Sequence, residues 1–176
     1  MPGILEEKEE MLRGEKSVCR LERVALDLAD VAARRALFAR IGSTTRKALI
    51  ISEGLLAYLD REDVLSLGRD LSAVSAFRRW AVDIASPGLL KMVQKSWGAR
   101  LAEGGSPLKF APPEGPGFFE AAGWKVLEVH SVFQAAARAK RLPFLLSLMA
   151  FLPESSGKQG GRPWSGVCVL ERSTVP

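Results

Sequence analysis

The chain has 176 residues, of which 47% are hydrophobic and 26% are charged. These values are ordinary for a soluble globular protein, and the length suits a single domain, residues 1–176, with a sizeable core. The net charge of +5 is spread along the chain, mostly as pairs of basic residues. Since no basic run is interleaved with aromatic residues and no zinc-finger spacing occurs, we expect no nucleic-acid partner.

Cysteine usage and apolar segments indicate a reduced, cytoplasmic protein. Cys19 and Cys168 lie far apart in the sequence and fit no metal-ligand spacing, so no metal site is expected. The acidic residues from Glu6 onward exclude a signal peptide. The longest apolar stretch, 142–152, contains Pro143 and is too short to span a bilayer, so we expect no membrane partner.

Along the chain, the hydrophobic pattern predicts strands alternating with helices. Strands are predicted at 21–28, 47–52, 79–85, 125–131 and 166–172, and helices at 2–13, 31–41, 61–75, 87–101, 118–122 and 133–151, the last bent at Pro143. Residues 103–117, rich in Gly and Pro, read as a lid-like loop, and 155–162 as a flexible loop. The alternation predicts an α/β fold with a mostly parallel sheet and helices on both faces.

Two carboxylates follow predicted strands directly and are the first candidates for a ligand site. Asp27 ends the strand at 21–28, and Glu53 follows the strand at 47–52. Open α/β sheets bind ligands at the carboxyl ends of their strands, where these groups could accept hydrogen bonds from amine or hydroxyl donors. Taken alone, however, a carboxylate after a strand is more often a helix cap or a surface group.

Three further residues have both a functional and a structural interpretation. His130, the only histidine, ends a predicted strand and could act as a general base, although a structural or surface role fits it better. Asp83 could face the site or cap the helix that follows, and Tyr58 could lie near a substrate or simply pack. The sequence therefore assigns no catalytic residue.

The segment SEGLLAYLDREDV, residues 52–64, resembles the segment after the fourth strand in the leucine carboxyl methyltransferase family. This family includes many bacterial putative O-methyltransferases of secondary metabolism. ALDL (25–28) resembles the family's Asp-Leu element, FFEAAGWKVLEV (118–129) its late helix, turn and strand, and PGILEEKEEML (2–12) the helix after its second strand. The resemblance covers nearly the whole chain.

The resemblance implies a Rossmann-like class I methyltransferase fold and S-adenosylmethionine as the methyl donor. It implies that Asp27 and Leu28 contact the adenine and that Glu53 lies beside the cofactor. The methyl acceptor would be a carboxylate or hydroxyl group of a small molecule or peptide terminus. Transfer of a methyl group from a sulfonium depends mainly on proximity and alignment, so the lack of an acid–base constellation is no objection.

The chain departs from the family at its start. No Gly-x-Gly follows a strand, although the family wraps the cofactor with such a loop after its first strand. We therefore expect an N-terminally truncated family member that lacks the first strands and binds cofactor weakly or not at all. The alternative is a non-catalytic interaction or regulatory remnant of the fold. Sheet edges left open by the missing strands are expected to allow self-association.

Overall fold

The computed structural model describes residues 2–105, 107–141, 143 and 162–173. The chain divides into two units, residues 1–37 and 38–176, which are described separately below. Whether the two units form the expected single domain stays a prediction.

The first unit contains helix α1, Pro2–Met11, an extended segment and the first half of helix α2, Val31–Thr44. The strand predicted at 21–28 is wrong, because these residues form no strand and are mostly exposed. The segment is held instead by local polar contacts, including an ion pair of 2.7 Å between Arg23 and Glu9 of α1. An apolar pattern indicates which residues could be buried, but a strand also needs a hydrogen-bonding neighbour, and no described strand pairs with this segment.

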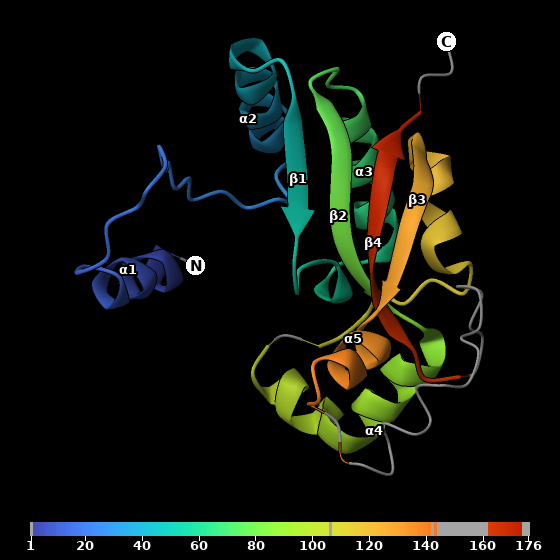
Figure 1. The fold of residues 1–176 in the computed structure, drawn as a ribbon. Helices are drawn as coiled ribbons and strands as arrows, with labels where there is room; N and C mark the ends of the chain where they lie inside the picture. Colours follow the sequence, from blue (N-terminus) through green and yellow to red (C-terminus); the bar gives the residue numbers. More distant parts are fainter. Residues whose placement is uncertain (1, 106, 142, 144–161, 174–176) are drawn as a thin grey trace. The chain divides into compact units, whose positions relative to one another are not determined.

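The second unit is built on a four-stranded sheet (Figure 1). Its strands are β1, Ala48–Ser52, β2, Phe77–Ala85, β3, Trp124–Ser131, and β4, Ser165–Arg172, in the order β1-β2-β4-β3. β1 and β2 are parallel, whereas β4 pairs antiparallel with both β2 and β3. The α/β fold class is thus confirmed, and the described sheet is mixed: β1, β2 and β3 run in one direction, and only β4 runs against its neighbours.

The helical segments of the second unit follow the predicted ones closely. They are the short 3-10 helix η1, Leu56–Tyr58, then α3, Arg61–Ser72, α4, Pro87–Glu103, the 3-10 helix η2, Gly115–Ala122, and α5, Val132–Arg138. The helix predicted at 133–151 ends early, at Arg138, and Lys140 then takes a positive φ of 55°. Residues 142, 144–161 and 174–176 lie outside the described residues, and with them nearly all of the apolar stretch and the predicted loop at 155–162.

The core of the second unit lies between the sheet and the pair α3 and η2. Trp80 of β2, Trp124 of β3 and Phe119 of η2 are fully buried, and their rings meet edge to face at 5.1 to 5.5 Å. Both indole N–H groups are satisfied: Trp80 donates to Ser52 Oγ at 2.9 Å and Trp124 to the Gly68 carbonyl at 2.9 Å. These bonds fix β1 to β2 and β3 to α3 at buried points, where an unpaired donor would be costly.

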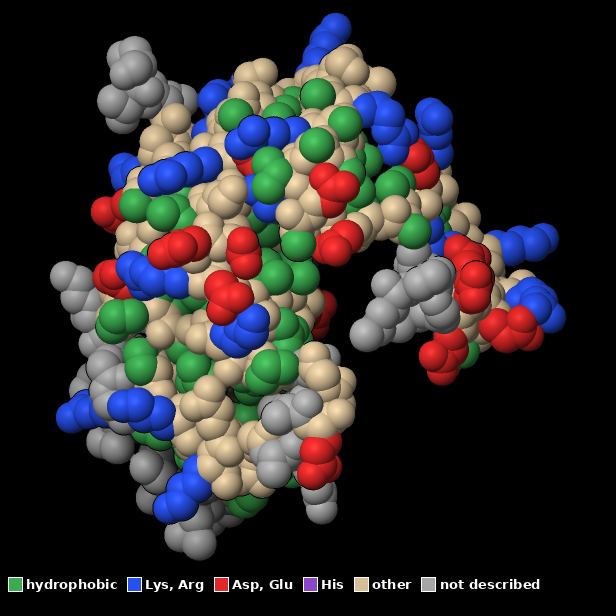
Figure 2. All heavy atoms as spheres, turned by 180° about the vertical axis from the view of Figure 1, so that it is seen from behind, with side chains coloured by type: hydrophobic (Ala, Val, Ile, Leu, Met, Phe, Trp, Pro, Cys, Tyr) green, Lys and Arg blue, Asp and Glu red, His purple; other side chains and the backbone are tan. Residues whose placement is uncertain are grey.

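Charged side chains of both signs are interspersed with hydrophobic ones on the face shown in Figure 2. No helix among the described residues has both the length and the apolar character needed to cross a bilayer. The described part of the chain also contains no cluster of three His, Cys, Asp or Glu side chains that could hold a metal ion.

The two cysteines are expected to differ sharply in reactivity. Cys19 is exposed, whereas Cys168 is buried on β4, where desolvation raises the pKa of its thiol to about 12. The thiolate is the reactive species, so Cys168 should be inert in the folded protein. Titration with a disulfide reagent at pH 8 should give one fast thiol in buffer and two in denaturant. Two fast thiols in buffer would contradict the burial of Cys168.

Candidate functional site

The carboxyl ends of the parallel strands β1 and β2 meet at one edge of the sheet, with Ser52 paired to Val82. The chain leaves β1 through Glu53 and Gly54, and Gly54 has a φ of +60°, which favours glycine. The Gly54 N–H donates to Asp83 Oδ1 of β2 at 3.1 Å. This bond ties the loop after β1 to β2 and places the Asp83 side chain at this edge of the sheet, while a role of Asp83 in a site stays a prediction.

The capping role considered for Asp83 belongs to Ser86 instead. Ser86 lies directly before Pro87, the first residue of α4, and its Oγ accepts the N–H of Leu89 at 3.2 Å and of Trp164 at 2.9 Å. The same hydroxyl donates to the Arg162 carbonyl at 2.6 Å. Ser86 was missed in the sequence, although a serine followed by proline is a recognised signal for the start of a helix.

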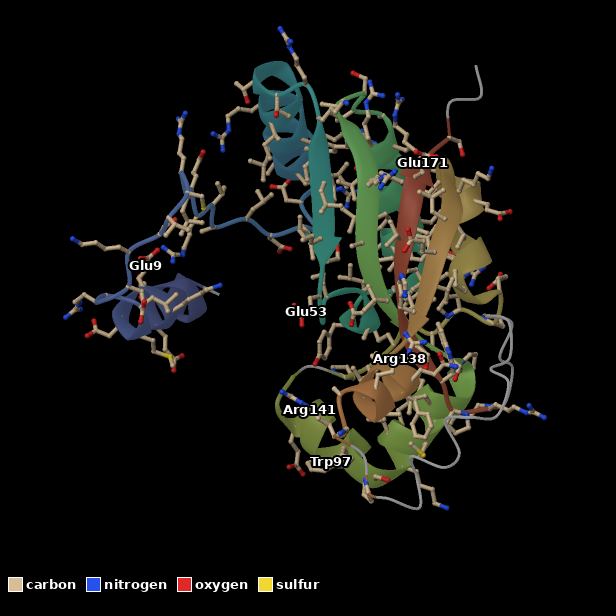
Figure 3. The ribbon with its side chains drawn as sticks, viewed as in Figure 1. Glu9, Glu53, Trp97, Arg138, Arg141 and Glu171 are labelled. Carbon is tan, nitrogen blue, oxygen red and sulfur yellow. The ribbon has the colours of Figure 1, made fainter. Side chains whose placement is uncertain are left out.

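Glu53 is exposed at this edge, and Figure 3 places it just beyond the end of β1. Among the described residues its carboxylate has no ion-pair or hydrogen-bond partner, so it is available to a donor group from outside. The structure therefore places Glu53 directly after the end of β1, as the sequence predicted. Whether it contacts a cofactor stays a prediction.

A small cavity of about 180 Å³ opens beside Asp83. Its walls come from the end of β2, the starts of α5 and β4, η1 and the loop before η2, and they are mainly apolar: Ala57, Asp83, Ile84, Ala85, Phe110, Val132, Ser165 and Gly166. Pockets for drug-sized ligands usually span about 300–1,000 Å³. This cavity is therefore large enough for a small acceptor group but not for a nucleoside.

The loop that provides Phe110 is fastened to η1 and α3. The backbone N–H groups of Lys109 and Phe110 both donate to the Ala57 carbonyl, at 2.7 and 3.1 Å. Arg61 donates both of its terminal N–H groups to Glu114, at 2.5 and 3.2 Å. These hydrogen bonds lower the pKa of Glu114 from its usual value. The segment predicted as a lid-like loop is thus held against the edge where the cavity lies.

Asp27 and Leu28 lie in the first unit, so the structure describes their surroundings separately from those of Glu53. Asp27 does not end a strand: its Oδ1 accepts the Ala29 N–H at 2.9 Å in a local turn. The Leu28 carbonyl accepts a bond of 2.9 Å from the buried Arg34 guanidinium. Asp30 lies directly before α2 and caps it, since its Oδ1 accepts the Ala33 N–H at 3.0 Å. The strand-end geometry expected for Asp27 is therefore wrong, and its contact with adenine stays a prediction.

His130 and Tyr58 do not line the cavity. The His130 Nε2 lies 2.8 Å from Glu128 Oε2 on the same strand, and both side chains are more than half exposed. Tyr58 is 40% exposed on η1. The surface role favoured for His130 agrees with this position.

No protein-family model matches the chain, and no curated protein matches it by sequence. Among solved structures, it is similar to the crystal structure of magnesium protoporphyrin IX methyltransferase (ChlM) from Synechocystis PCC 6803 with bound SAH. The TM-score is 0.50 at 13% sequence identity, and the match covers 97% of this chain. At this identity the similarity shows the fold alone, a Rossmann-like α/β fold of the kind found in that methyltransferase. The chain spans 59% of the length of that methyltransferase.

Proposed function

We propose that this chain carries the acceptor-side half of a methyltransferase site that uses S-adenosylmethionine and methylates an oxygen atom. The observation that supports the proposal most is the edge formed by β1 and β2. There a hydrogen bond from the Gly54 N–H to Asp83 fixes the loop that carries the exposed Glu53, and Asp83 also lines a small, mainly apolar cavity. The resemblance of residues 52–64 to the leucine carboxyl methyltransferase family and the similarity to a solved methyltransferase support the same assignment.

The residues at this edge fit one wall of a cofactor site. S-adenosylmethionine supplies a methyl group on a positively charged sulfur and carries amine and hydroxyl donors, all of which a carboxylate can attract. Glu53 provides such a carboxylate, and Asp83 holds the backbone that carries it. The cavity of about 180 Å³ would take the acceptor group, since its apolar walls exclude water from a small carboxylate or hydroxyl.

A second candidate is a non-catalytic interaction module that retains the fold. The sequence favours it in one respect, because no Gly-x-Gly follows a strand in this chain, whereas the resembled family wraps the cofactor with such a loop. Titration of the chain with S-adenosylmethionine by calorimetry separates the two candidates. Saturable binding at micromolar to millimolar cofactor is expected for the enzyme, and its absence at millimolar concentration would exclude cofactor use by this chain.

Replacement of Glu53 by glutamine is expected to weaken cofactor binding about tenfold or more, because a charged hydrogen bond contributes about 1.5–3 kcal/mol. The matched control is Glu120→Gln, which removes another exposed carboxylate, on η2. Binding of S-adenosylmethionine by the two variants should be compared by calorimetry under one set of conditions. Equal loss in both variants, or no loss in Glu53→Gln, would contradict a role for Glu53.

The acceptor class can be tested by the stability of the product. If methyl transfer from labelled cofactor to a panel of small carboxylic acids, alcohols, amines and thiols is detected, brief alkaline treatment distinguishes the two oxygen acceptors. A methyl ester releases its label as methanol, whereas a methyl ether keeps it. Release would support a carboxyl acceptor, and label retained on an amine or thiol acceptor would refute O-methylation. A reaction of this kind in the cytoplasm, in secondary metabolism, agrees with the family resemblance.

A further inference from the structure

Asp83 is the only charged residue among the described walls of the small cavity. Its Oδ1 accepts the Gly54 N–H, whereas its Oδ2 has no hydrogen-bond or ion-pair partner among the described residues. In the part of the chain that the structure describes, no buried side-chain nitrogen or oxygen atom lacks a partner. Oδ2 is therefore accessible, and a molecule in the cavity can donate a hydrogen bond to it.

The charge around the cavity favours an uncharged ligand group over a carboxylate. No basic side chain is found among the described walls. Lys109, in the loop before η2, is paired with Asp60 at 2.8 Å, and Arg61 of α3 is paired with Glu114. A bound carboxylate would meet the like charge of Asp83 without a compensating cation. A hydroxyl group would instead donate a charge-assisted hydrogen bond to Asp83.

The apolar walls suit a single aromatic ring. The cavity holds about 180 Å³, and an engineered apolar cavity of about 150 Å³ binds benzene. Phe110 is 5% exposed, its ring meets the Phe118 ring edge to face at 5.0 Å, and its N–H donates to the Ala57 carbonyl at 3.1 Å. One wall is therefore an aromatic ring already fixed in place, which favours a second ring over a flexible aliphatic chain.

We propose that the cavity binds a phenol, with the ring against Phe110 and the hydroxyl group donating to Asp83 Oδ2, and that Asp83 selects this ligand against a carboxylate. As the identity of the methyl acceptor, this inference rests on the proposed function and narrows its two oxygen acceptors to one. As a binding site it needs no cofactor, because all of its described walls belong to the second unit.

Calorimetry on the full chain with phenol, toluene and benzoate at pH 7.5, without cofactor, measures the selection. Phenol should bind saturably at millimolar concentration or below, and benzoate should bind at least tenfold more weakly because of the like charge. Toluene has the size and shape of phenol but no hydroxyl group. Its binding therefore reports on the apolar walls alone.

Asp83→Asn removes the charge but keeps an oxygen that can accept the Gly54 N–H. This variant should weaken phenol binding about five- to tenfold, because a neutral hydrogen bond replaces a charge-assisted one, and should narrow the difference between phenol and benzoate. Toluene binding should stay within about twofold, which shows that the cavity is intact. Asp63→Asn, at an exposed position on α3 outside the cavity walls, is the matched control and should change none of the three affinities.

A second variant locates the site. Ala57→Leu adds a larger side chain to the cavity wall and should weaken phenol and toluene binding alike by at least tenfold. Unchanged binding in this variant, benzoate binding as tight as phenol binding, or phenol binding indifferent to Asp83→Asn would overturn the proposal, as would the absence of phenol binding. Phenol selection without cofactor binding would refute the proposed function alone, and cofactor binding without phenol selection would refute this inference alone.

Discussion

Replacing Trp80 by alanine is expected to lower the free energy of unfolding by about 3–5 kcal/mol. The indole is fully buried, meets the rings of Phe119 and Trp124 edge to face, and donates to Ser52 Oγ. The substitution therefore leaves a cavity in the core and a buried hydroxyl without its donor. Since domains are stable by only about 5–15 kcal/mol, much of the second unit's stability would be lost. Urea unfolding followed by far-UV circular dichroism measures the change.

Two variants separate ring packing from the hydrogen bond. Trp80→Phe keeps an aromatic ring but removes the N–H, so its cost should be smaller than that of alanine, and part of it should come from the unsatisfied Ser52 Oγ. Trp97→Ala, at a position on α4 that is 57% exposed, should change the free energy of unfolding by less than about 1 kcal/mol. A cost for Trp97→Ala equal to that of Trp80→Ala would contradict the described core.

Gly68→Ala is expected to destabilise the protein by about 1–3 kcal/mol, although alanine is the better helix former. A Cβ at position 68 of α3 would lie 2.8 Å from the Ala122 Cβ of η2 and 3.6 Å from the Trp80 ring. The Gly68 carbonyl also accepts the Trp124 indole N–H, so α3 cannot shift without breaking that bond. The clash therefore outweighs the gain of about 1 kcal/mol in helix propensity.

The matched control for this prediction is Gly98→Ala on α4. There the nearest atom to a new Cβ is the Gln94 Cβ at 3.7 Å, an ordinary contact. Only the difference in helix propensity should then contribute, so the free energy of unfolding should rise by up to about 1 kcal/mol. Adding Ala122→Gly to Gly68→Ala should recover part of the lost stability, because it removes the clashing atom. Thermal or urea unfolding measures the change in the free energy of unfolding for each variant. A change of the same sign for Gly68→Ala and Gly98→Ala would refute the close packing of α3 on η2.

Local signals in the sequence predicted most elements of the second unit. The apolar run KALIIS gave β1 to within one residue, and Asp60 and Pro87 marked the starts of α3 and α4. Gly123, with a φ of +84°, ends η2 where the sequence placed its stop. Such signals depend only on nearby residues, so they can be interpreted without knowledge of the tertiary contacts.

Features that depend on distant partners were predicted less well. Residues 21–28 have the composition of a strand but no described pairing partner, and the antiparallel direction of β4 depends on where the chain re-enters the sheet. The end of α5 at Arg138, where the sequence pattern continued to Phe151, also has no local signal, since Lys140 is an unusual residue for a positive φ.

The features of the candidate site also differ in whether they depend on nearby or on distant residues. Glu53 was predicted because the end of a parallel strand is a local property with a known position in the sheet. The partnership of Asp83 with Gly54 joins residues 29 positions apart, so the sequence could only leave Asp83 with two possible roles. The Ala57 carbonyl accepts the N–H groups of Lys109 and Phe110. Because every residue has a backbone carbonyl, no residue type in the sequence could indicate this role.

All aromatic side chains of this protein lie in the second unit, since the first Phe, Tyr or Trp in the sequence is Phe38. Intrinsic fluorescence and near-ultraviolet absorbance therefore belong to residues 38–176 alone, and residues 1–37 are optically silent. A shift in tryptophan emission on adding a ligand would identify the second unit as the part that responds. A tryptophan introduced at Leu21 or Val24, both exposed in the first unit, would give residues 1–37 a signal of their own.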